Sequence, residues 1–106
     1  MHAVIHCVIS PTDALETTME SLLDIYYTLL ENVKYYFNDN TMGIVQLLQE
    51  DVLTIRPMAS ATVDIRERSL SDNMAFLVNL AFYFGERCLF FNVHYRILLE
   101  IAKSIV

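Results

Sequence analysis

Three side chains that can bind a metal ion lie within the first seven residues: His2, His6 and Cys7. On a helix, His2 and His6 would share one face at a spacing that zinc sites use. The apolar residues around them favour a strand instead, which would separate the two histidines by more than about 12 Å. No second group of histidines, cysteines or acids supplies further ligands at a recognisable spacing. We therefore expect no metal ion and no other cofactor.

A second pair of reactive residues lies near the C-terminus. Arg87 and His94 stand seven residues apart, so both project from one face if the helix is continuous. This pair, in a small acidic helical protein, resembles the R-x(4–6)-H signature of HEPN-type ribonucleases. The resemblance implies RNA cleavage without metal, with His94 acting on the ribose 2′-hydroxyl and Arg87 on the phosphate. The structural alternative, which we favour, is an arginine flanking a helix and a partly buried, hydrogen-bonded histidine.

The composition excludes several classes of protein. Hydrophobic residues make up 55% of the 106 residues and charged residues 19%, which is the reverse of the pattern in disordered chains. A chain of this length forms one domain, so we expect a single domain over residues 1–106. So many apolar residues exceed what a small monomer buries. An apolar surface should therefore remain, and we expect a homodimer.

Neither a membrane span nor an oxidising compartment is expected. In the apolar C-terminal region, the longest stretch without Asp, Glu, Lys or Arg runs over residues 73–85. It is shorter than the about 20 residues that a spanning helix needs. Cys7 and Cys88 are isolated in apolar surroundings, which is typical of buried free thiols in a reducing compartment. We therefore predict a cytoplasmic protein, either of a cell or of an infected host.

The net charge of −6 is unevenly distributed along the chain. Residues 1–55 contain eight acids and one base, whereas residues 56–106 contain five acids and six bases. Nucleic-acid binding needs clustered Lys and Arg, so a nucleic-acid partner is not expected. An acidic half can instead bind a basic protein.

The best-marked element is an amphipathic helix over about residues 11–37. Ser10 suits the N-cap and Pro11 the first helical position, while residues 38–40 (Asn-Asp-Asn) end the helix. Acidic residues fall in one narrow sector of this helix, opposite a broad apolar face. We expect this acidic stripe to bind the partner, through Asp13, Glu16, Glu20, Asp24 and Glu31.

A short helix and a small β element are predicted next. Residues 42–51 carry apolar side chains at helical spacing. Over residues 52–66, β-branched and polar residues alternate on both sides of Pro57, a pattern typical of a small β-hairpin. An all-α bundle without this hairpin is the alternative.

Residues 72–106 are predicted to form a long apolar C-terminal helix, with Ser71 as its N-cap. It either breaks near residues 91–94 or packs its second half against a different surface. A helix that is apolar almost all round is normally buried. The core or a dimer interface should therefore contain Phe82, Phe84, Gly85, Phe90 and Phe91. The segment 82–86 is similar to a helix of small bacterial immunity-type proteins.

These patterns predict a mainly α protein that binds another protein and is not an enzyme. We expect an inhibitor of the antitoxin, immunity or phage/viral host-interaction type. Its acidic helix face would bind the partner, and its apolar C-terminal helix would form the dimer or partner interface. The first alternative is a metal-independent ribonuclease that uses Arg87 and His94. The second is a structural subunit that assembles only with itself.

Overall fold

The computed structural model of the protein describes residues 13–58 and 68–105, with side chains from residue 19 onwards. All regular elements in these ranges are helical, so the predicted mainly α fold is confirmed. In chain order they are α1 (Asp13–Val33), the short 3₁₀ helix η2 (Lys34–Tyr36), α2 (Asp39–Ile55), α3 (Leu70–Gly85) and α4 (Phe90–Ser104).

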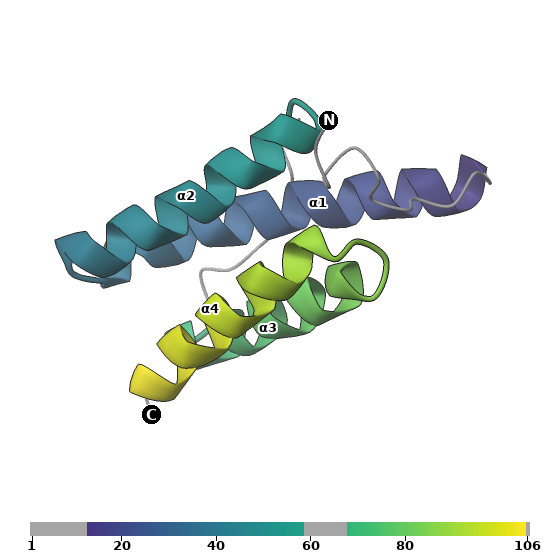
Figure 1. Ribbon diagram of the computed structural model, residues 1–106. Coiled ribbons are helices and arrows are strands. Elements are labelled where there is room, and N and C mark those ends of the chain that lie inside the picture. Colours follow the sequence, from purple (N-terminus) through teal and green to yellow (C-terminus); the bar gives the residue numbers. More distant parts are fainter. Residues whose placement is uncertain (1–12, 59–67, 106) are drawn as a thin grey trace.

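The four α-helices of the described residues form two antiparallel hairpins (Figure 1). α2 turns back along α1, and α4 turns back along α3. α1 also contacts α3, so this long helix connects the two hairpins. The Cα radius of gyration is 13.3 Å, close to the about 13 Å of a compact chain of this length.

α1 confirms the described part of the helix predicted over 11–37. Its buried residues recur every three or four positions, as the helical period requires: Met19, Leu23, Tyr26, Leu29, Leu30 and Val33. The 3₁₀ turn η2 then tightens the end of the helix before the chain reverses.

α2 is longer than the predicted helix over 42–51. It begins at Asp39 because Asn38 is its N-cap, with the Asn38 side-chain oxygen accepting a hydrogen bond from the Thr41 backbone N–H at 2.9 Å. The residues Asn38 to Asn40, predicted to end one helix, therefore also begin the next. α2 extends to Ile55, two residues before Pro57.

The hairpin predicted over 52–66 is wrong for residues 52–55, which form the last turn of α2. The buried side chains Val45, Leu48 and Val52 lie three and four residues apart, so a helical period governs this segment despite the local alternation. The described residues contain no strand. Residues 56–58 form no regular element, and residues 59–66, the rest of the predicted hairpin, lie outside the described part of the chain.

The long helix predicted over 72–106 is two helices, α3 and α4, joined by a turn at residues 86–89. The turn begins where the backbone N–H groups of Arg87 and Cys88 both donate to the Phe84 carbonyl, at 3.0 Å and 2.8 Å. Folding back lets the apolar face of α4 pack on α3 and α1, which one continuous helix could not do. α3 begins two residues earlier than predicted, because Ser69 rather than Ser71 is the N-cap.

Side chains from all four helices contribute to one core. Its largest fully buried members are aromatic: Tyr26 in α1, Phe84 in α3 and Phe91 in α4. None of the described helices is both long enough and apolar enough to cross a membrane.

Cys88 differs from its prediction. It is buried in the core, as expected, but it is disulfide-bonded and not a free thiol. Disulfides persist in oxidising compartments, so Cys88 does not support the predicted reducing compartment. Cys7 lies outside the described residues.

Candidate functional site

A buried histidine connects three helices through two hydrogen bonds. His94 of α4 has an exposed fraction of 1%. Its Nδ1 lies 2.8 Å from the hydroxyl of Tyr26 in α1, and its Nε2 lies 3.0 Å from Oδ2 of Asp51 in α2. Tyr26 is fully buried, whereas the Asp51 side chain is 44% exposed. The three side chains therefore form a chain of hydrogen bonds that leads from the core to the surface.

The contacts assign a donor and an acceptor to each bond. A carboxylate only accepts, so His94 Nε2–H donates to Asp51, and Nδ1 then accepts from the Tyr26 hydroxyl. This is the neutral imidazole, and burial lowers the pKa of His94 below its ordinary value of 6.5, with the Asp51 hydrogen bond acting in the opposite direction. Burial, reinforced by the Asp51 carboxylate, raises the pKa of Tyr26 well above 10.

Aromatic rings enclose this chain of hydrogen bonds. The ring of Phe91 lies 4.9 Å from the His94 ring, and that of Phe90 lies 5.5 Å away. Phe84 packs edge-on against Tyr26 at 5.3 Å. Because these rings exclude water, each hydrogen bond matters more than it would at the surface. Both ring nitrogens of His94 are occupied by hydrogen bonds and the ring is buried, so the arrangement connects α1, α2 and α4 within the core.

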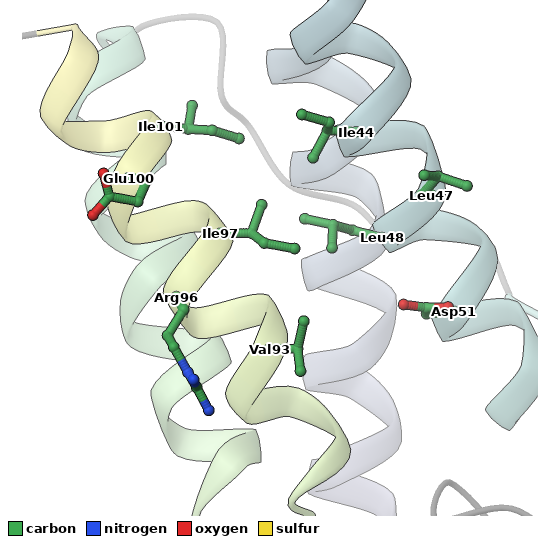
Figure 2. Close-up of a pocket in the computed structure, with 9 residues that line it drawn as sticks. All are labelled: Ile44, Leu47, Leu48, Asp51, Val93, Arg96, Ile97, Glu100 and Ile101. Carbon is green, nitrogen blue, oxygen red and sulfur yellow. The ribbon is translucent and has the colours of Figure 1, made fainter.

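An apolar groove of about 690 Å³ begins beside Asp51 and runs between α2 and α4 (Figure 2). Leu48 of α2 and Ile97 of α4 point toward each other across it. Two walls of mostly aliphatic side chains line the groove: Ile44, Leu47, Leu48 and Asp51 from α2, and Val93, Arg96, Ile97, Glu100 and Ile101 from α4.

Several groove side chains remain in contact with water although they are apolar. The exposed fraction is 60% for Leu47, 55% for Val93 and 40% for Ile44. Contiguous exposed apolar side chains rimmed by charges are typical of binding surfaces. The groove is therefore the candidate functional site among the described residues.

Two opposite charges stand one helical turn apart on the α4 wall of the groove. Arg96 and Glu100 are both exposed and extend from the side of α4 that faces away from α2 (Figure 2). Among the described residues, Glu100 forms one ion pair, with Lys103 at 3.4 Å, and this pair is exposed to solvent. Arg96 has no ion-pair partner within 4.0 Å in the described part of the chain. Solvent-exposed ion pairs such as Glu100–Lys103 contribute little to stability. Both Arg96 and Glu100 are therefore available to bind a partner.

The acidic stripe predicted to bind a partner is only partly free. Asp24 forms an ion pair with Arg56 at 2.7 Å, and the Arg56 guanidinium also donates to the Glu20 carbonyl at 3.3 Å. Glu20 itself is exposed. The side chains of Asp13 and Glu16 lie outside the described ones.

Glu31, like Asp24, forms its hydrogen bonds and its ion pair with other residues of the chain. Its carboxylate accepts from Gln49 of α2 at 3.0 Å, from Tyr35 at 2.8 Å, and pairs with Lys34 at 2.9 Å. These contacts, the Gln49 hydrogen bond above all, hold the pKa of Glu31 below its ordinary value of 4.5. Part of the stripe therefore attaches α2 to α1.

Arg87 and His94 do not share a continuous helix. Arg87 lies in the turn between α3 and α4, where its guanidinium donates to the Tyr83 carbonyl at 2.9 Å and lies 3.7 Å from the centre of the Tyr83 ring. His94 is buried and hydrogen-bonded, as the structural alternative expects. The geometry offers no support for the ribonuclease alternative.

The five residues predicted to build the core or a dimer interface have different environments. Phe84, Gly85 and Phe91 are buried in the core. Phe90 is half-buried, and Phe82 is 53% exposed against the Tyr95 ring. The groove uses none of them.

Sequence reasoning missed Asp51 and the groove. Asp51 is one acid among eight in residues 1–55, and nothing in the spacing marks it as a partner of His94. One available signal was the histidine itself, because a histidine in an apolar helix needs a polar partner when it is buried.

The described residues contain no group of three or more His, Cys, Asp or Glu side chains that could hold a metal ion. His2, His6 and Cys7 lie outside them. Comparison of the chain with protein families, curated proteins and solved structures finds no match.

Proposed function

We propose that the protein is a non-catalytic protein-binding module whose interface is the groove between α2 and α4. The single observation that carries the proposal is the exposed apolar lining of this groove, with Leu47 and Val93 more than half exposed. Burying such side chains against a partner is favourable by about 25 cal/mol per Å² of apolar surface.

The charges on the groove indicate what the partner must offer. An acidic side chain of the partner would complement Arg96, and a basic one would complement Glu100. Apolar residues of the partner would fill the groove beside them. The partner is therefore a polypeptide of mixed charge. The acidic stripe of α1, expected from the sequence to bind a basic protein, is secondary here because Asp24 and Glu31 have partners within the chain. The proposal does not include the predicted cytoplasmic location, because Cys88 is disulfide-bonded.

A site-specific photocrosslink tests the proposal. The photoreactive amino acid p-benzoylphenylalanine replaces Leu47, and the chain is expressed in the cell that produces it. We expect one discrete crosslinked polypeptide, which disappears when Val93→Glu places a charge in the groove.

The matched control places the same photoreactive residue at Leu53. This leucine is also exposed on α2, at 44%, but does not line the groove. Equal crosslinking from Leu47 and Leu53, or a product that survives Val93→Glu, would contradict the proposal.

A further inference from the structure

We infer that His94 is a proton-dependent connection between the two helical hairpins, so that protonation of its ring separates α2 from α4 and releases the polypeptide bound in the groove. This inference rests on the proposed function and adds the regulation of that site. Within the described residues, His94 forms every side-chain hydrogen bond that joins one hairpin to the other. Apart from these bonds, the hairpins meet chiefly where α1 packs against α3.

The hydrogen bond between Asp51 and His94 lies at one end of the groove. Asp51 lines the groove from α2, and Val93, the residue before His94, lines it from α4 (Figure 2). Beyond this bond the walls are mostly aliphatic, and apolar contacts are not directional, whereas a hydrogen bond of 3.0 Å fixes a distance. Loss of the bond therefore lets α2 and α4 move apart about the contact of α1 with α3, which changes the width of the groove.

Protonation of His94 is unfavourable while the helices are together. The added proton occupies Nδ1, which then no longer accepts from the Tyr26 hydroxyl. The hydroxyl hydrogen of Tyr26 is left without that acceptor among the rings of Phe84 and Phe91. The positive charge also lies in the core away from water, which is costly even beside a carboxylate. Movement of α4 away from α2 exposes the ring to water and relieves both costs.

The groups around His94 set the pH at which this happens. From α2 the ring faces the Asp51 carboxylate, and from α1 the Tyr26 hydroxyl, which stays neutral because burial raises its pKa well above 10. The described acids of α1 are exposed or paired elsewhere, and the charged side chains of α3 and α4 are exposed. Burial outweighs the attraction of Asp51, so the pKa of His94 lies below 6.5 and the helices separate only below that pH.

Double electron–electron resonance between two spin labels tests the separation in the isolated full chain. The labels are attached to p-acetylphenylalanine, so that the disulfide stays intact, at Gln46 of α2 and Lys103 of α4, both exposed. We expect one narrow distance distribution at pH 8 and a longer, broader one at pH 5. The control pair within one hairpin, Ser21 of α1 and Gln46, should keep its distance. Far-UV circular dichroism checks that the helices persist at both pH values.

Three variants assign the pH dependence to His94. His94→Gln keeps a donor for Asp51 and an acceptor for Tyr26 but takes up no proton, so its distances should not change with pH. Asp51→Asn, at a side chain that is 44% exposed, removes the carboxylate that attracts the protonated ring. The separation should then occur at a pH higher by about 0.5 unit or more. Glu50→Gln, the same charge change on the adjacent exposed acid, should shift it by less than about 0.2 unit.

The photocrosslink from Leu47 tests the release, in a cell extract adjusted to pH 8 or to pH 5. The yield of the crosslinked polypeptide should fall by about tenfold or more at pH 5. In His94→Gln the yield should be the same at both pH values. Because both chains meet the same extract, any titration of the partner affects them equally.

The outcomes separate this inference from the proposed function. Equal distances at pH 8 and pH 5, or a loss of helical signal together with the change in distance, overturn the separation, and a crosslink from Leu47 then still supports the groove. A change in distance that persists in His94→Gln, or a midpoint that Asp51→Asn leaves in place, overturns the role of His94. Equal crosslink yields at both pH values overturn the release. A chain that separates with pH but crosslinks to no polypeptide overturns the proposed function, and the release with it.

Discussion

α2 and α4 are joined at one end and separated at the other. At the joined end, His94 of α4 forms hydrogen bonds with Asp51 of α2 and with Tyr26 of α1, and aromatic rings surround these bonds. At the open end, Ile44 of α2 points toward α4 across the groove, and Leu47 is exposed beside it. The same two helices thus carry a contact that serves folding and a surface that is left for a partner. Substitutions at the joined end should change stability, and those at the open end should change association.

The largest expected effect is at the joined end. His94→Ala removes a fully buried ring, leaves a cavity and takes away the partners of Tyr26 and Asp51. We expect a loss of about 3–5 kcal/mol in the free energy of unfolding, measured by urea denaturation. Val93→Ala is the matched control on the same helix, and its 55% exposed side chain should cost less than about 1 kcal/mol. Equal losses for the two variants would show that the buried, hydrogen-bonded His94 contributes no more to stability than its exposed neighbour.

Tyr26→Phe removes one hydroxyl and keeps the ring. Nδ1 of His94 is then buried without a donor, so we expect a loss of about 1–3 kcal/mol. Tyr27→Phe, on the neighbouring and half-buried tyrosine, should have a much smaller effect. Thermal unfolding measures both. An unchanged melting temperature for Tyr26→Phe would show that the hydrogen bond to His94 contributes nothing to stability.

The stability should also depend on pH. Because burial lowers the pKa of His94 in the folded protein, the unfolded chain binds the extra proton more readily. Stability is therefore complete above pH 6.5 and falls as the pH decreases through that value, the ordinary pKa of histidine. Glu31, whose pKa lies below 4.5, contributes a further loss only below that pH.

Urea denaturation between pH 5 and pH 8 isolates the histidine contribution. We expect the midpoint to decrease toward pH 5 in the wild type, and this decrease to be much smaller in His94→Ala. A wild-type stability that does not change over this range would contradict the buried neutral histidine.

The smallest expected effect is a gain at the open end. Gly43 precedes Ile44 in α2, its φ is not positive, and a Cβ added there meets no atom within 4 Å. Gly43→Ala should therefore raise the free energy of unfolding by about 0.5–1 kcal/mol through helix propensity. Gly85→Ala is the counterpart at a packed position, where the new Cβ would lie 2.5 Å from the Asn92 side-chain oxygen. Chemical denaturation should show a smaller gain there, or none, and an equal gain at both positions would contradict this.

Much of the secondary structure could be predicted from the sequence. The apolar period of α1 indicated a helix, and the helical content of residues 72–104 was expected. Two boundaries were wrong because equally good capping residues stand close together: Ser69 and Ser71 before α3, and Asn38 after one helix and before the next. The turn at residues 86–89 was not placed, because the segment is apolar on both sides and nothing local ends the helix sharply.

The candidate site could be predicted only in part. An apolar surface was expected from the excess of hydrophobic residues, but its location was not. Asp24 and Glu31 had the spacing of a solvent-exposed stripe. In the structure Asp24 instead pairs with Arg56, which follows α2, and Glu31 accepts a hydrogen bond from Gln49 of α2. A helical wheel shows which residues share a face. It does not show which face another helix covers.

By itself, the sequence determined that α1, residues 42–51 and most of residues 72–104 are helical, because propensity, capping and apolar period act between residues a few positions apart. Only the tertiary structure decided which polar groups are buried and which apolar groups are left open. The hydrogen bonds of His94 join residues 68 and 43 positions apart in the chain. Such contacts depend on how whole helices pack, and the groove between α2 and α4 exists because these two helices, joined at Asp51 and His94, are apart at Ile44 and Ile101.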